Sequence, residues 1–102
     1  EGGIVQSASW TLFEEVLYSP ERIESRDWSA YPILRFDAVP ASVTVRPIDR
    51  PGEPFLGTGE CAQGPTAAAI ANAVRDATGV RIRDLPYSPK RLQTALRETE
   101  FS

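Results

Sequence analysis

The sequence predicts a small α+β domain, in which a sheet of two to four strands packs with about three helices. Apolar residues recur at helical spacing near the start of the chain and in its second half. Between these segments lies a stretch in which apolar and polar residues alternate, as in a half-buried strand. A length of 102 residues permits one domain with a modest core.

The first helix is predicted over residues 3–17, and Pro20 lies just beyond it because proline cannot continue a helix. Its apolar residues form two stripes, one of Val5, Ala8, Leu12 and Val16 and the other of Trp10, Phe13 and Leu17. A surface helix usually carries one stripe, so two stripes indicate packing on more than one side. A chain this short can hardly cover both. We therefore expect the second stripe to form an exposed apolar patch that supports self-association.

Two strands are predicted over residues 31–36 and 42–48. In the second strand, Val43 and Val45 alternate with polar residues, which is the pattern of a strand with one buried face. Prolines inside both segments favour edge positions or strand ends, and Pro40 is expected to turn the chain between them.

Two further helices are predicted over residues 65–78 and 88–96, after a turn-rich connection at 49–54. Pro65 suits the first position of a helix, where its missing N–H is not needed. Gly79 suits the C-terminal cap of the same helix, and Ser88 suits the N-cap of the next.

Composition excludes several classes of function. Eleven Lys and Arg against fourteen Asp and Glu give a net charge of −3, which argues against nucleic-acid binding. The absence of histidine excludes Ser-His-Asp and Cys-His nucleophiles and His-ligated metals within this chain. A single cysteine, Cys61, excludes an internal disulfide and is expected to pack as a small residue. The chain starts at Glu1 without a signal peptide, so we expect a processed start or a piece of a longer protein.

The segment Gly57-Thr-Gly-Glu60 is the place where chemistry is most expected. A glycine-rich segment that leads into a helix N-terminus resembles an anion site, because free N–H groups and the positive end of the helix dipole point the same way. The carboxylate of Glu60 is a candidate general base. The alternative is a tight turn with a solvated glutamate, and spacing alone does not separate the two interpretations.

The longer pattern around this segment is more specific. Gly57-Thr-Gly-Glu60 is followed by a proline-containing helix entry, by Ala71-Asn-Ala73 and by Thr78-Gly-Val-Arg-Ile-Arg-Asp-Leu-Pro86. Two further motifs precede these, the opening Glu1-Gly-Gly-Ile-Val-Gln6 and the segment Trp28-Ser-Ala-Tyr-Pro-Ile33. The order of all these motifs along the chain resembles the C-terminal end of a catalytic subunit. That polypeptide is the molybdopterin-binding large subunit of the xanthine dehydrogenase/aldehyde oxidase family. The chain looks like a bacterial member of the isoquinoline 1-oxidoreductase or nicotinate dehydrogenase type, with aldehyde dehydrogenation as a further alternative.

The resemblance implies an oxidoreductase that hydroxylates an N-heterocycle or an aldehyde, with water as the oxygen donor. It assigns Glu60 as the general base and brings Gly57, Thr58 and Gly59 close to the cofactor. The cofactor is molybdenum held by molybdopterin, often as the cytosine dinucleotide, so no residue of this chain is expected to ligate a metal. Electrons leave through iron–sulfur clusters on another domain or subunit.

The resemblance also implies that residues 1–102 are the C-terminal part of a larger molybdopterin-binding domain. A cofactor-contacting glutamine of the family precedes residue 1, and Gln6 is not that residue. We therefore expect no bound molybdenum and no turnover from this chain alone. The expected partners are the remainder of the large subunit, an iron–sulfur subunit or domain and a small-molecule substrate, in a cytoplasmic or a membrane-associated, periplasm-facing enzyme. The alternative function is a non-catalytic assembly module.

Overall fold

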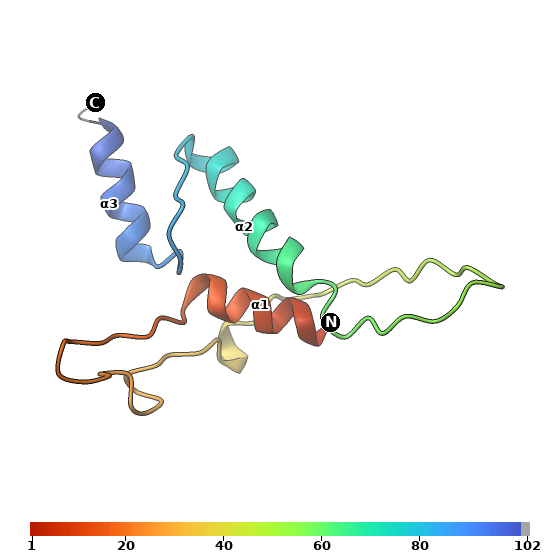
Figure 1. The fold of residues 1–102 in the computed structure, drawn as a ribbon. Coiled ribbons are helices and arrows are strands. Elements are labelled where there is room, and N and C mark those ends of the chain that lie inside the picture. Colours follow the sequence, from red (N-terminus) through yellow and green to blue (C-terminus); the bar gives the residue numbers. More distant parts are fainter. Residues whose placement is uncertain (101–102) are drawn as a thin grey trace.

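The structure, a computed structural model, describes residues 1–100 and shows an open arrangement of three α-helices (Figure 1). They are α1 (Gly2–Leu12), α2 (Gln63–Thr78) and α3 (Pro89–Glu100), with a short 3₁₀ helix, η1 (Phe36–Ala38), in the long connection between the first two. The radius of gyration is 17.1 Å, against about 13 Å for a compact domain of this length. No helix among the described residues is both long and apolar enough to cross a membrane.

The predicted α+β class is wrong. Residues 1–100 contain no strand, and the single isolated bridge pairs Tyr18 with Ile23. The segments 31–36 and 42–48 are largely extended, except where Phe36 enters η1, but neither lies beside a second strand. A strand needs a neighbour to satisfy its backbone N–H and C=O groups, so an alternating pattern without a neighbour gives extended chain instead of a sheet.

Helix α1 is shorter than predicted, because it ends at Leu12 instead of residue 17. Just beyond its end, Glu14 accepts hydrogen bonds from the hydroxyls of Ser9 and, at 2.7 Å, Tyr31. The oxygen of Ser9 also accepts the backbone N–H of Leu34 at 2.9 Å. These contacts draw the chain after Leu12 towards the 31–34 segment, so the last residues of both apolar stripes lie outside the helix.

Helix α2 packs against α1 through small and polar side chains (Figure 1). Ser7 and Ala8 of α1 are buried, and the Ser7 hydroxyl donates to the carbonyl of Gln63 at 2.6 Å. The Gln63 side chain donates to that of Gln6 at 2.9 Å. The helix starts two residues earlier than predicted and ends as predicted, because Gly79 caps it with φ 74. Only small residues permit this close approach of the two helices.

Helix α3 is connected to the end of α1 by the segment that precedes it. The N–H of Tyr87 donates to the carbonyl of Thr11 at 2.7 Å, and Arg91 donates to the carbonyl of Pro86 at 2.8 Å and to Glu15 at 3.1 Å. The Ser88 hydroxyl accepts the N–H of Arg91 at 3.3 Å, as an N-cap does, so that prediction is confirmed.

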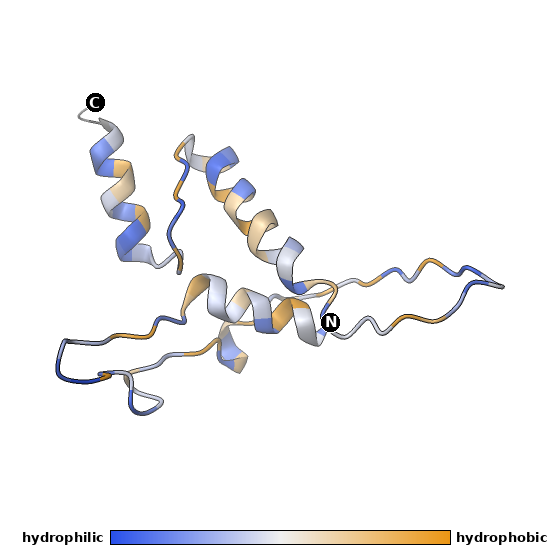
Figure 2. Cartoon of the chain, in the orientation of Figure 1, coloured by the Kyte–Doolittle hydropathy of each residue, from blue (hydrophilic) through white to orange (hydrophobic). Residues whose placement is uncertain are grey.

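The apolar core is very small. Among the described residues, Ala8, Ile82 and Pro86 are the buried aliphatic or aromatic side chains, whereas many larger ones are exposed. Figure 2 shows apolar segments along the helices and also along the long connections. From the predicted patch, Phe13 and Leu17 are exposed and Trp10 is half-buried. Trp28 is 71% exposed within this chain.

Candidate functional site

Glu60 lies in the turn that leads into α2, and its side chain is exposed. Its carbonyl accepts the N–H of Gln63 at 3.0 Å, which ties the residue to the first turn of the helix. Glu60 takes part in none of the ion pairs found among the described residues. The carboxylate is therefore attached to a rigid element and is open to an incoming group, which are the two properties that a general base requires.

Gly57 and Gly59, which precede Glu60 in the turn, have open space around them. A methyl group added at Gly57 or Gly59 would meet no atom within 4 Å. Neither residue has a positive φ, since among the described glycines only Gly52 and Gly79 do. Because these two residues carry no side chain, they leave the backbone of the turn uncovered.

The carbonyl oxygen of Gly59 faces the start of α1. A methyl group at Gly3 would lie 2.9 Å from that oxygen, which is too close for any real side chain. Gln63 accepts a hydrogen bond from the Ser7 hydroxyl and donates one to the Gln6 side chain, and with these bonds the contact fixes the loop against α1. Sequence reasoning missed Gly3 and Ser7 as positioning residues, because a glycine or a serine inside a helix carries no sign of a distant partner.

Thr58 and Cys61 flank Glu60 in the same turn. The Cys61 thiol donates to the carbonyl of Thr58 at 3.2 Å, and both residues are exposed. The expectation that Cys61 packs as a small buried residue is therefore wrong within this chain. The predicted site residues Gly57, Thr58, Gly59 and Glu60 thus form one exposed turn.

The residue types around Glu60 fit contact with a cofactor and not ligation of a metal. Within residues 1–100, no three His, Cys, Asp or Glu side chains come together as a metal site. The turn offers one carboxylate, uncovered backbone and open space at two glycines.

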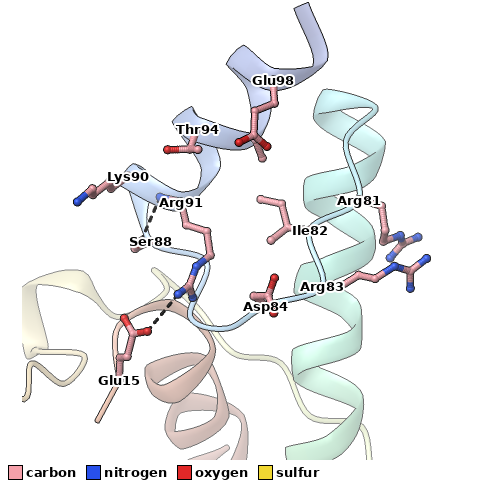
Figure 3. Close-up of a pocket in the computed structure, with 11 residues that line it drawn as sticks. Glu15, Arg81, Ile82, Arg83, Asp84, Ser88, Lys90, Arg91, Thr94 and Glu98 are labelled. Carbon is pink, nitrogen blue, oxygen red and sulfur yellow. Dashed lines mark hydrogen bonds and ion pairs between the residues drawn. The ribbon is translucent and has the colours of Figure 1, made fainter. Parts of the chain in front are cut away.

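A separate cleft of about 630 Å³ lies between α3 and the 81–84 segment (Figure 3). The Ile82 side chain points from the 81–84 segment towards α3, and Arg91 reaches across to Glu15. Arg81 and Arg83 point towards α2, and Arg81 donates to the side chain of Asn72 at 3.0 Å. None of residues 57–60 lines this cleft.

Comparison with known proteins gives relatives that match nearly the whole chain. It is 45% identical over 95 residues to the B subunit of nicotinate dehydrogenase from Pseudomonas putida, a match that covers 93% of this chain and 8% of that protein. It is 33% identical over 89 residues to the beta subunit of isoquinoline 1-oxidoreductase from Brevundimonas diminuta, covering 87% of this chain and 11% of the relative. It is 35% identical over 97 residues to the putative xanthine dehydrogenase molybdenum-binding subunit XdhA of Escherichia coli. That match covers 89% of this chain and 13% of the relative.

No profile of a protein family matches the chain. The chain spans only about a tenth of the length of each relative, whereas the matched region is almost all of the chain. The similarity that the motifs indicated is confirmed by these three proteins. Over most of its length, this chain is similar to a segment of these oxidoreductase subunits, which fits a fragment of the xanthine dehydrogenase family.

Proposed function

We propose that this chain is part of a molybdenum-dependent hydroxylase and that Glu60 is its general base. The proposal is supported by the match to three oxidoreductase subunits over most of the chain. It is carried by one structural observation: Glu60 is exposed, and its turn is fixed to α2 and to the start of α1. The substrate class is an N-heterocycle or an aldehyde, and the cofactor is molybdopterin, in the cytosine dinucleotide form.

The chemistry requires one proton acceptor near the substrate carbon. Hydroxylation replaces a C–H bond by C–OH with oxygen from water, and it releases two electrons and two protons. Molybdenum, when bound, supplies the two-electron acceptor and the Lewis acid that makes the attacking oxygen acidic. The carboxylate of Glu60 accepts one of the protons. Gly57 and Gly59 leave room for the cofactor, and Gly3 and Ser7 hold the turn in place through Gly59 and Gln63.

The test is Glu60→Gln in the complete large subunit. We expect kcat to fall by about 10²–10⁴-fold while molybdenum content stays at the wild-type level, because the amide keeps the size of the side chain and cannot accept the proton. Glu21→Gln is the matched control, since Glu21 is an exposed glutamate outside the turn. Near-normal turnover of Glu60→Gln with full molybdenum content would contradict the proposal.

The second candidate, a non-catalytic assembly module, is favoured by the large apolar side chains that this chain leaves exposed. On that view Glu60 is a surface residue of a turn, and the apolar side chains serve contact with another protein. The same experiment separates the two candidates, because an assembly module predicts equal activity for Glu60→Gln and Glu21→Gln. Only the catalytic candidate requires a partner that accepts electrons, which we propose to be an iron–sulfur subunit or domain.

A further inference from the structure

Residues 42–56 form a projecting arm that precedes the Glu60 turn. In Figure 1 its two legs run away from the helices and meet at a tip. The tip is a tight turn in which the N–H of Glu53 donates to the carbonyl of Arg50 at 3.2 Å, and their side chains form an ion pair at 3.6 Å. Gly52 has φ 88, a left-handed value that suits glycine at this position. The tip is therefore a defined turn, and the legs that leave it are extended.

The arm exposes its largest apolar side chains almost completely. Phe55 is 101% exposed, and Leu56 and Ile48 are each 86% exposed. Within residues 42–56, the bond at the tip is the one backbone–backbone hydrogen bond found. Single exposed apolar residues are ordinary, whereas Phe55 and Leu56 are adjacent, strongly exposed and carried on a backbone without a hydrogen-bonded neighbour.

The position of Phe55 and Leu56 matters because they directly precede Gly57. On its C-terminal side, the Glu60 turn is fixed by the bond from Gln63 and by the contact of Gly59 with Gly3. On its N-terminal side, the described part of the chain offers Phe55 and Leu56 no burial. A general base has to be held on both sides, since a displacement of about 1 Å can cost about 100-fold in rate.

We infer that Phe55 and Leu56 are positioning residues that dock into an apolar pocket on the remainder of the large subunit and thereby fix Glu60. This inference rests on the proposed function. The relatives favour this occupant over a second copy of the chain, because they carry the matched segment within polypeptides about ten times as long. A pocket in the same polypeptide meets the arm at a far higher effective concentration than a second molecule does.

The first measurement is chymotrypsin cleavage after Phe55 and Leu56, in the 102-residue chain and in the complete large subunit. We expect rapid cleavage in the short chain and cleavage at least about tenfold slower in the complete large subunit. The rate of cleavage depends on the fraction of molecules in which the segment is exposed to the protease, and docking lowers that fraction. Equal cleavage rates would overturn the inference. Protection in the short chain, together with a dimer in sedimentation, would overturn it in favour of a second copy.

The second measurement is steady-state kinetics of Phe55→Ala in the complete large subunit. We expect kcat to fall at least about tenfold with KM and melting temperature nearly unchanged, and Phe55→Leu to restore most of kcat. Phe36→Ala is the matched control, because Phe36 is 95% exposed and lies outside the arm. An unchanged kcat for Phe55→Ala overturns the inference.

The two proposals fail in different ways. If Glu60→Gln loses turnover while the arm is cleaved equally fast in both proteins, the docking inference is wrong and the base assignment stands. If the arm is protected in the complete large subunit and Glu60→Gln stays active, the base assignment is wrong. Docking of the arm is then supported without a link to catalysis.

Discussion

Gly3 of α1 faces the carbonyl oxygen of Gly59 so closely that a methyl group on Gly3 would lie 2.9 Å from that oxygen. The contact joins the first turn of the first helix to the turn that carries Glu60, although the two glycines lie far apart in the sequence. Since the neighbouring atom belongs to the backbone, it cannot move aside as the end of a side chain could. The position of Glu60 therefore depends on a residue without a side chain.

Gly3→Ala is expected to destabilise the α1–α2 contact. Overpacking costs about 1–3 kcal/mol, and only about 1 kcal/mol is regained from the better helix propensity of alanine. Thermal unfolding followed by circular dichroism measures the net loss. Gly2→Ala is the control, because a methyl group there meets no atom within 4 Å and the residue lies in the same helix. A Gly3→Ala protein as stable as Gly2→Ala would contradict the close contact.

Ser7→Ala is expected to lower the free energy of unfolding by about 1–3 kcal/mol. The Ser7 side chain is fully buried, and its hydroxyl is the donor to the Gln63 carbonyl at 2.6 Å. Removing the hydroxyl removes the hydrogen bond that joins Ser7 of α1 to the first residue of α2. Denaturant unfolding of Ser7→Ala and of Ser42→Ala, an exposed serine, gives the comparison. Equal midpoints for the two variants would show that the bond contributes nothing.

The helices were largely predictable from the sequence because their signals are local. Gly79 and Ser88 act as the expected caps, since a left-handed residue and a side-chain oxygen are needed at those positions whatever the surroundings. The end of α1 was not predictable in this way. It depends on Glu14 meeting Tyr31, and 17 residues separate them.

The sheet was not predictable because strand pairing is a property of two segments. Val43 and Val45 alternate with polar residues as a strand does, but the described chain brings no partner to them. The residues of the candidate site also differ in whether their signal is local or depends on a distant partner. The assignment of Glu60 is a prediction from its motif, whereas the contacts of Gly3 and Ser7 with the Glu60 turn and the start of α2 are visible only in the folded chain.

Arg91→Ala is expected to cost more stability than Glu15→Ala. Arg91 donates both to the Pro86 carbonyl at 2.8 Å and to Glu15 at 3.1 Å, and it holds α3 beside the end of α1. The ion pair is partly exposed, so its own contribution is below about 1 kcal/mol and is weakened by salt. A double-mutant cycle in low and high salt measures this coupling. A coupling energy that does not change with salt would show that Arg91 and Glu15 do not interact as a partly exposed ion pair.

The hydrogen bond from the Tyr31 hydroxyl to Glu14 makes the free energy of unfolding depend on pH in the alkaline range. That hydrogen bond, with smaller contributions from burial and from the negative charge of Glu14, raises the pKa of Tyr31 above its ordinary value of 10.0. Because the folded-state pKa is the higher one, the contribution to stability is fully present below pH 10.0 and is lost as pH rises through the folded-state pKa. Denaturant midpoints of the wild type and Tyr31→Phe are therefore expected to differ at neutral pH and to converge in strong alkali. A difference that stays constant through this range would show that the Tyr31 proton does not hold the 31–34 segment to α1.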